Sequence, residues 1–287
     1  MEFWFITTDH LSNRIWFRDD DDFMMGMNLV AVLAVALNVS VIAFILMSNH
    51  VHFVVRCSEE KAHQFIEEYK KRYSQYVNRK YGTKELLRRV RVKIDPIGGN
   101  DESFEWIVAY VHMNPVAAGI CLSSTDYRWG TGGTFFKSTP SRGRLLGTFS
   151  ERARIAMLHS TQEMPPHLIV GEDGYILPES YVQVEMVETI FRTPKRMNFF
   201  LQNSSKAKRR ISSDEADPPS FRDQLVYSAI PDLCHSLFKK TTLAALTGDE
   251  LAELLKQLRY RFSSNANQLM RVTGLTYAQV TELLSKA

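Results

Sequence analysis

Met47-Ser48-Asn49-His50-Val51-His52-Phe53-Val54-Val55 places two histidines on either side of one valine, in a run typical of a β-strand. Side chains two residues apart point to the same face of a strand, so His50 and His52 should stand side by side. Neutral imidazole binds many divalent cations, and the pair is therefore a candidate seat for one ion. An isolated His-x-His is more often two partly exposed strand histidines, so the rest of the chain has to decide.

Bulk composition is that of a globular protein long enough for two domains. The chain has 287 residues, of which 45% are hydrophobic and 23% charged, and its formal net charge is only +3. Any affinity for nucleic acid must therefore come from local clustering of cations. The three cysteines are far apart and form no Cys-x-x-Cys, which argues against a disulfide scaffold and a cysteine-built zinc site. The first residues show no secretory signal, so we expect an intracellular location.

The segment 27–46 is almost wholly apolar and about long enough to span a bilayer. Asn38 and Ser40 interrupt it, and its composition changes there. Residues 27–37 are rich in alanine and leucine and favour a helix, whereas residues 39–46 are β-branched and favour a buried strand. We therefore predict a buried helix, a turn near Asn38 and a strand, with no membrane span.

Alternation and helical periodicity predict an α+β fold for the N-terminal part. The predicted elements are strand 3–8, helix 23–37, strands 39–47 and 50–56 in a hairpin, helix 59–81 and strand 89–94. This order is that of a ferredoxin-like, split βαβ antiparallel sheet. A further helix runs from Glu102 to about Val111 and carries Tyr110. It should end near Asn114-Pro115, with Tyr110 and Asn114 on one side.

A basic cluster follows the histidine strand. Between Lys70 and Lys93 the chain has ten Lys or Arg against one acid, Glu85. Interleaved tyrosines and cations suit single-stranded nucleic acid, because the cations meet phosphates and the rings stack on bases. A solvated helix face with core tyrosines would give the same pattern. The predicted DNA contacts here are Lys70, Lys71, Arg72, Arg79, Lys80, Arg88, Arg89 and Arg91.

The C-terminal end has the pattern of a helix-turn-helix. Residues 249–260 and 265–272 predict two helices, and Gly274 lies in the turn that follows. Thr276 and Gln279 form a capping box at the start of a third helix. Many small helical bundles share this pattern, but a helix-turn-helix would make Tyr277, Gln279 and Thr281 the readers of DNA.

The composition also suggests a domain division. It comprises a first domain at 1–137, a linker with a small mixed or helical module at 138–220, and an all-helical DNA-binding domain at 221–287. Residues 138–150 are rich in Ser, Thr, Pro, Gly and Arg and are predicted to be a linker.

Two motifs together resemble the HUH single-tyrosine transposases, specifically the REP-associated tyrosine transposase branch. They are Met47-Ser48-Asn49-His50-Val51-His52 and Tyr110-Val111-His112-Met113-Asn114-Pro115-Val116-Ala117-Ala118-Gly119. Asp126-Tyr127-Arg128-Trp129 follows at the spacing that the family shows. The resemblance covers roughly residues 1–136, and it implies a bacterial cytoplasmic protein that acts at the nucleoid.

The resemblance also implies roles for single residues. His50 and His52 match the histidines that hold Mg²⁺ or Mn²⁺, and Tyr110 matches the nucleophilic tyrosine. The family takes a third metal ligand from the tyrosine helix, which we assign to Asn114, with His112 as a weaker candidate. A phosphotyrosine link retains the energy for rejoining. No nucleotide cofactor is therefore expected, and the sequence has no Gly-x-x-x-x-Gly-Lys motif.

The leading hypothesis is a metal-dependent single-stranded DNA endonuclease and strand transferase, acting on hairpin-forming repeat DNA through a 5′-phosphotyrosine intermediate. One alternative is a non-catalytic, sequence-specific DNA-binding regulator that uses the C-terminal helix-turn-helix. A second is a metal-dependent hydrolase that cuts with activated water. The expected partner is single-stranded or hairpin DNA, and the protein could be a monomer or a homodimer.

Overall fold

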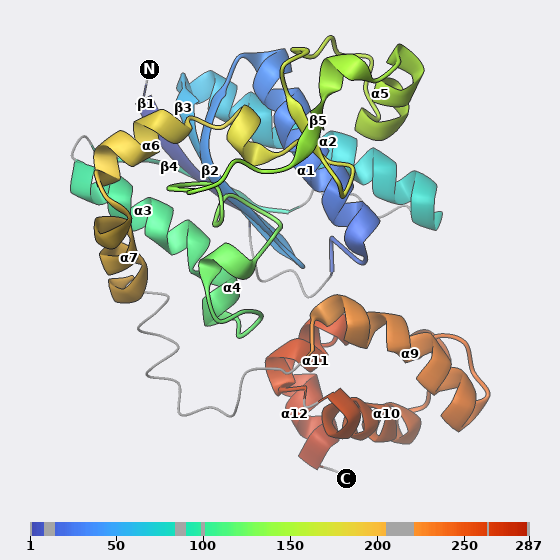
Figure 1. Ribbon diagram of the computed structural model, residues 1–287. Helices are drawn as coiled ribbons and strands as arrows, with labels where there is room; N and C mark the ends of the chain where they lie inside the picture. The colour runs from blue at the N-terminus through green and yellow to red at the C-terminus, as the bar shows by residue number, and fades with distance from the viewer. Residues whose placement is uncertain are drawn as a thin grey trace.

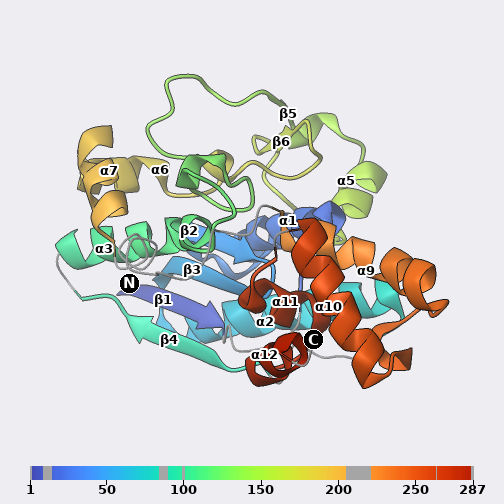
Figure 2. The ribbon, with the colours of Figure 1, turned by 90° about the horizontal axis from the view of Figure 1, so that it is seen from below.

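A four-stranded antiparallel sheet organises the N-terminal part of the protein (Figure 1). The computed structural model describes residues 2–8, 15–83, 90–98, 101–204, 221–262 and 264–285. The elements of the sheet layer are β1 (Glu2–Thr8), α1 (Asp20–Leu37), β2 (Ser40–Met47), β3 (His50–Cys57), α2 (Glu59–Tyr81) and β4 (Val92–Pro96). The strands lie in the order β2-β3-β1-β4, which confirms the predicted ferredoxin-like sheet (Figure 2).

The two faces of the sheet carry different helices. Phe53 on β3 contacts Phe65 and Tyr69 of α2, with ring centroids 5.3 and 5.2 Å apart. Its neighbour His52 points the other way and contacts Tyr110 on α3 (Asp101–His112). Helix α2 packs against α1, so these two helices cover one face and α3 lies on the other. The period of two along β3 therefore separates the candidate site from the main aromatic core.

Helix α1 and strand β2 account for the long apolar segment. The side chain of Asp19 accepts a hydrogen bond from the Asp22 backbone N–H at the start of α1, and three acidic residues follow in its first turn. The helix ends at Asn38, which has left-handed φ and ψ of 50° and 54°, as the predicted turn requires. Within the described residues, no helix is long and apolar enough to cross a membrane.

Residues 126–130 extend the edge of the sheet beside β2. The backbone N–H of Leu46 donates to the Trp129 carbonyl at 2.8 Å, and the Tyr127 hydroxyl donates to the Leu46 carbonyl at 2.7 Å. A Cβ at Gly130 would lie 2.5 Å from the Phe44 carbonyl oxygen, so only glycine allows this approach. These contacts of residues 126–130 support the end of β2, immediately before the turn that leads to His50.

The segment after residue 137 packs onto this layer. Its elements are β5 (Gly143–Leu145), η3 (Leu146–Thr148), α5 (Glu151–Leu158), β6 (Ile169–Gly171), η4 (Pro178–Ser180), α6 (Val184–Phe191) and α7 (Pro194–Asn203). Buried Asn28 of α1 donates to the Met157 carbonyl and accepts from the Ile176 N–H. The predicted linker 138–150 therefore contains β5 and η3, and Leu146 is fully buried. The polar composition of residues 138–150 gave no sign that Leu146 would be buried.

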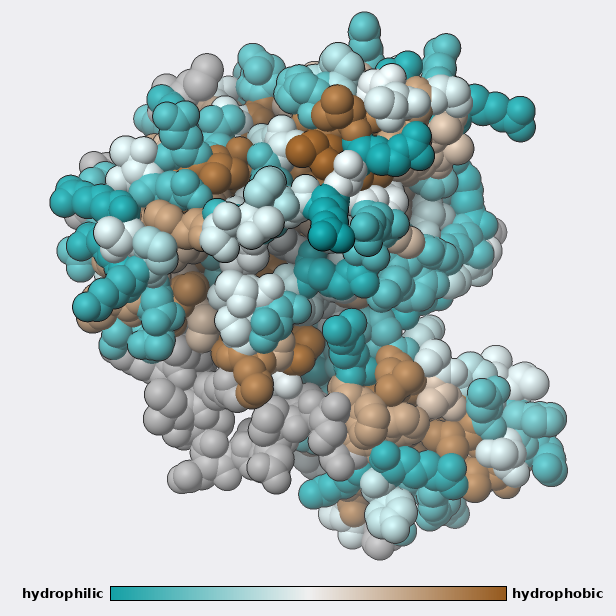
Figure 3. All heavy atoms as spheres, in the orientation of Figure 1, coloured by the Kyte–Doolittle hydropathy of each residue, from teal (hydrophilic) through white to brown (hydrophobic). Residues whose placement is uncertain are grey.

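The C-terminal residues form a helical module with its own hydrophobic core. It contains α9 (Asp223–Phe238), η5 (Leu243–Ala245), α10 (Gly248–Phe262), α11 (Ala266–Thr273) and α12 (Tyr277–Ser285). Three of these helices were predicted, whereas α9 was not. The Thr276 N–H donates to Gln279 Oε1, and the Gln279 N–H donates to Thr276 Oγ1, which confirms the capping box. The module forms a separate lobe in the space-filling view (Figure 3).

Candidate functional site

The histidine pair lies at the start of β3, at one end of the sheet. The His50 and His52 rings are 4.9 Å apart between centroids and nearly perpendicular. His50 is partly exposed and its Nδ1 lies 2.8 Å from Asn49 Oδ1, whereas His52 is only 3% exposed. Two imidazoles at this separation on one strand face can approach a common ion, which is the arrangement that the sequence pattern predicts.

Tyr110 of α3 meets this pair. Its ring centroid lies 5.7 Å from that of His52 and 5.8 Å from that of Phe5 on β1, with edge-to-face geometry in both cases. Phe5 also stacks on His52 at 5.7 Å. Because Tyr110 is partly exposed, its ring is held by Phe5 and His52 without being enclosed. The structure therefore brings together the histidines and the tyrosine that the sequence separates by 58 residues or more, from position 52 to position 110.

Asn114 begins the short helix α4 (Asn114–Ala117), just after Tyr110. Its Nδ2 donates to the backbone carbonyls of Tyr110 and Val111, at 2.8 and 3.1 Å, and so satisfies the end of α3. In this structure Asn114 therefore caps the C-terminal end of α3. Since the amide nitrogen is used in this way, the carbonyl oxygen is the atom with ligand chemistry, and a metal role for Asn114 stays a prediction.

His112 lies away from the site. It is fully buried, its Nε2 is 2.9 Å from Thr131 Oγ1, and its ring packs near Phe135. Burial lowers the pKa of His112 to about 3, so the imidazole is neutral at physiological pH. Thr131 in turn contacts the backbone of Phe44 on β2, and His112 therefore helps to hold α3 against the sheet edge.

The turn before His50 is attached to the C-terminal module. Ser48 Oγ donates to Asp223 Oδ2 at 2.6 Å, and Arg271 makes two hydrogen bonds to the same carboxylate at 2.7 and 2.9 Å. Burial alone would raise the pKa of Asp223. The positive charge of Arg271 and the hydrogen bonds that the Asp223 carboxylate accepts outweigh burial, so the pKa of Asp223 is lowered. The sequence offered no signal for this contact, because Ser48 and Asp223 are 175 residues apart.

A cleft opens between the histidine turn and the C-terminal module. It has a volume of about 320 Å³ and is bordered by Asn49, His50, Ala117, Ala118, Asn265, Asn267, Met270 and Arg271. His50 thus borders a space between the two parts of the molecule. Among the described residues, Arg271 is the one cation that borders this cleft, and it is already bound to Asp223.

Most of the predicted DNA-binding cations lie elsewhere. Lys70 is buried and paired with Glu67, while Lys71 and Arg72 both contact Glu68. Lys80 contacts Asp19 and buried Asp22, at 2.6 and 2.9 Å. Arg79 is exposed, and Arg88 and Arg89 lie outside the described residues. Because α2 is on the other face of the sheet from Tyr110, the structure does not gather these cations around the histidine pair.

Strand β4 does bring cations to the site's face. His52 is paired with Thr7 of β1, and Thr7 is paired with Lys93 of β4, so the three side chains share one face. Lys93 lies two strands from His52, about 10 Å away, and pairs with Asp95 at 2.7 Å. The predicted contact Arg91 precedes β4 and is exposed. Sequence reasoning counted Lys93 in the basic cluster but did not single it out, although the strand alternation could have done so.

The predicted DNA readers of the C-terminal module are all on α12. Tyr277 is 45% exposed. Gln279 is used in the capping box, and Thr281 Oγ1 contacts the carbonyls of Tyr277 and Ala278 in its own helix. Two of the three polar side chains therefore already make hydrogen bonds within the module, and their DNA-reading role stays a prediction.

The sheet order, the histidine pair on β3 and the tyrosine on α3 define the fold as that of the HUH proteins, α+β with an additional all-helical module. Residues 16–114 match the family described as "Transposase IS200 like". This segment contains the histidine pair and Tyr110, so the part of the chain that carries the candidate site is similar to the IS200-like transposases.

Comparison with solved structures gives a distant similarity. One is described as "Structure of the REP associates tyrosine transposase bound to a REP hairpin". It shares 17% identity with this chain and has a TM-score of 0.37, over 45% of this chain and 76% of that chain. No curated protein sequence matches the chain.

Proposed function

We propose that the protein is a metal-dependent endonuclease and strand transferase for single-stranded DNA, with Tyr110 as its nucleophile. The observation that carries the proposal is the contact of the Tyr110 ring with His52, which itself contacts His50. A tyrosine beside two imidazoles, at a partly open end of a sheet, is the set of groups that phosphodiester cleavage through a covalent intermediate requires.

In the proposed reaction the Tyr110 oxygen attacks the scissile phosphorus and forms a Tyr–O–P bond. The P–O3′ bond breaks, the tyrosine proton leaves, and the departing 3′ oxygen takes up a proton. The DNA 5′ end is then held as a phosphotyrosine. Attack by a 3′ hydroxyl reverses the same bonds and joins the strands, so the exchange consumes no nucleotide. Phe5 and His52 fix the plane of the Tyr110 ring and so limit the directions of attack.

His50 and His52, with the Asn114 carbonyl oxygen, are the residues that would hold Mg²⁺ or Mn²⁺. The donor set fits such an ion, since the two rings are adjacent and lie on one strand face. Within the described residues there is no cluster of three or more His, Cys, Asp and Glu side chains, and the third ligand proposed here, Asn114, is of another residue type. When bound, the ion would neutralise the charge on the phosphoryl oxygens.

The DNA would reach the site from the side of β4. Lys93 lies in the same row of the sheet as His52, and the exposed Arg91 precedes that strand. Cations there can bind phosphates that flank the scissile one. A hairpin-forming repeat is the proposed substrate. It follows from the resemblance to the REP-associated branch.

Trapping a covalent adduct tests the proposal. The protein is incubated with 5′- and 3′-labelled single-stranded repeat DNA and Mn²⁺, and the products are separated on a denaturing gel. The proposal requires a protein–DNA adduct that Tyr110→Phe abolishes. Free 5′-phosphate ends with no dependence on Tyr110 would instead support the hydrolase that uses activated water.

A second candidate is a non-catalytic DNA-binding regulator. The short helices α11 and α12, joined at Gly274 with the capping box at Thr276, favour it. This candidate predicts binding of double-stranded operator DNA without any covalent adduct.

A further inference from the structure

A large pocket lies on the opposite side of the molecule's sheet from Tyr110. It has a volume of about 780 Å³, within the range of small-molecule sites. It is lined by Met25, Leu29, Arg72, Gln75, Tyr76, Arg79, Lys80, Ile155, Leu158, His159, Ser160 and Thr161. The pocket lies between α1, α2 and α5, and residues 155–161 are outside the segment that matches the transposase family.

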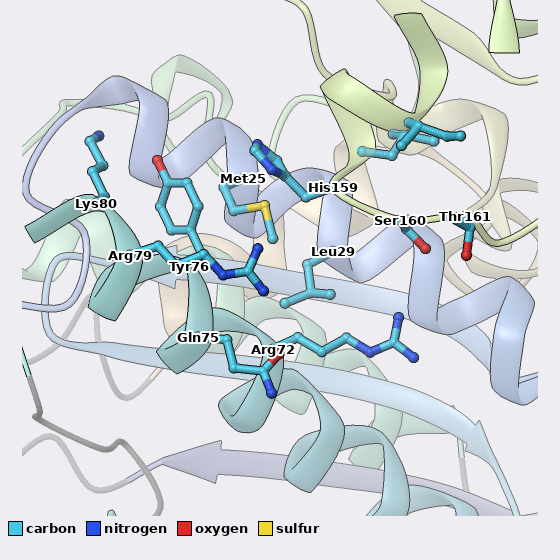
Figure 4. Close-up of a pocket in the computed structure, with 12 residues that line it drawn as sticks. Met25, Leu29, Arg72, Gln75, Tyr76, Arg79, Lys80, His159, Ser160 and Thr161 are labelled. Carbon is cyan, nitrogen blue, oxygen red and sulfur yellow. The ribbon is translucent and has the colours of Figure 1, made fainter. Parts of the chain in front are cut away.

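One wall of the pocket is cationic. Arg72, Tyr76 and Arg79 recur at spacings of three and four on α2, so they share one helix face. Figure 4 shows the Arg72 and Arg79 side chains extending into the space between α2 and the segment of His159 to Thr161. The residues that line the pocket include three cations and no carboxylate.

The three cations differ in how far they are neutralised. Lys80 is bound by Asp19 and Asp22, and these hydrogen bonds raise the pKa of Lys80 despite partial burial. Arg72 contacts Glu68 at 3.3 Å, and Glu68 also contacts Lys71. Within the described part of the chain, no ion pair involves Arg79. Arg79 therefore contributes the largest uncompensated charge in the pocket.

The opposite wall is apolar with a polar rim. Met25 and Leu29 are four residues apart on α1, and Ile155 and Leu158 are three apart on α5, so each pair presents one apolar surface. The rings of Tyr76 and His159 lie 5.6 Å apart at one end. Ser160 and Thr161 add hydroxyl groups to the rim. A ligand that fits both walls needs an anionic group and a flat or apolar body.

We propose that this pocket binds a nucleoside phosphate, with the phosphate at Arg79 and Arg72 and the base against the apolar wall and Tyr76. Guanidinium groups bind phosphate oxygens through paired N–H donors, and aromatic rings stack on any base. The ligand could be a free nucleotide or an unpaired nucleotide of a DNA strand, and both offer the same chemistry. Because the pocket and Tyr110 are on opposite faces, this site does not depend on the proposed cleavage reaction.

Binding to the full-length protein tests the proposal. Deoxyadenosine 5′-monophosphate is titrated by calorimetry, with deoxyadenosine as the probe that lacks the phosphate. A fluorescein-labelled dT oligonucleotide is titrated by anisotropy. The variants are Arg79→Gln and Arg72→Gln, and the control is Lys195→Gln, which removes one charge from an exposed position of α7 outside the pocket. All proteins also carry Tyr110→Phe, so that no covalent adduct contributes.

We expect Arg79→Gln to weaken binding about tenfold, since the lost hydrogen bonds are charge-assisted, and Lys195→Gln to change it little. Loss with the mononucleotide identifies a free nucleotide as the ligand. Loss with the oligonucleotide alone identifies an unpaired base of a strand. Equal effects of Arg79→Gln and Lys195→Gln on both probes, or equal affinity for nucleotide and nucleoside, would overturn the proposal.

Discussion

The two faces of the sheet use tyrosine in opposite ways. On the α2 face, Tyr69 and Tyr73 are fully buried and donate to the backbone carbonyls of Gly26 and Trp16. Burial raises the pKa of both hydroxyls well above the usual value, so these tyrosines stay neutral and structural. On the α3 face, Tyr110 is only partly buried and contacts a histidine ring. Exposure and partners, rather than residue type, distinguish a candidate nucleophile from a core side chain.

The most direct test of this comparison removes one tyrosine hydroxyl from each face of the sheet. We expect Tyr110→Phe to abolish the covalent DNA adduct, because phenylalanine has no oxygen to attack phosphorus. Tyr69→Phe on α2, which loses only the hydrogen bond to the Gly26 carbonyl, serves as the control and should form the adduct at the normal rate. The measurement is adduct yield with labelled single-stranded DNA and Mn²⁺. An adduct that survives in Tyr110→Phe would show that the nucleophile lies elsewhere.

The next effect should come from the histidines on the same face. His50→Ala and His52→Ala should each slow metal-dependent adduct formation by about 1,000-fold, since the metal supplies several kcal/mol of charge stabilisation. His63→Ala, at an exposed position on α2, is the control. Initial rates are measured over a range of Mn²⁺ concentrations. Rates within a few-fold of the unmodified protein would remove the metal role from this pair.

Asp223→Ala should destabilise the protein by about 3 kcal/mol, because it leaves Arg271 without its buried partner. Asp232→Ala, exposed on the same helix, should change stability little. Urea unfolding of the full chain, followed by circular dichroism, gives the comparison. The same comparison also tests whether the stability of the α3 face depends on the C-terminal module, since Asp223 accepts a hydrogen bond from Ser48.

The contribution of the Asp223 carboxylate to folding stability should depend on pH in a defined direction. Its pKa is lowered in the folded state, so its contribution to stability is complete above the unfolded value of about 4. The contribution is lost as pH falls through the folded pKa. The stability difference between the unmodified protein and Asp223→Ala should therefore shrink in acid. A difference that stays constant down to pH 2 would mean that the ion pair is not its source.

Much of this arrangement could be predicted from the sequence. Local patterns were sufficient for the sheet, since β-branched composition located β2 and the hairpin turn before His50 located β3. Helical spacing predicted α2 at residues 59–81, the bounds that the structure has. The contact of Tyr110 with His52 followed from the order of the elements and the family motifs. In each case the signal lies within one element or in a known topology.

The rest depended on contacts between distant residues. Lys70 and Lys80 look like solvent-exposed cations in the sequence, but Lys70 is buried and Lys80 is bound by acids of α1. Which face of α2 packs against the rest of the protein decides whether these cations are exposed, and a count of charges in the sequence does not contain that information. Likewise, Asp223 was not distinguishable from other acids, because its partner Ser48 belongs to another module.

The smallest effect is expected farthest from both faces, at the start of α12. Thr276→Ala should destabilise the protein by about 1 kcal/mol, because the Gln279 N–H loses its capping oxygen. Thr281→Ala on the same helix is the matched control, and its loss should cost less because its hydroxyl bonds only to carbonyls of its own helix. Since α12 belongs to neither face of the sheet, adduct formation on a short oligonucleotide should be unchanged in both variants. A loss of adduct in Thr276→Ala would mean that cleavage at the α3 face depends on the C-terminal module. The comparison of the two sheet faces would then have to include that module as well.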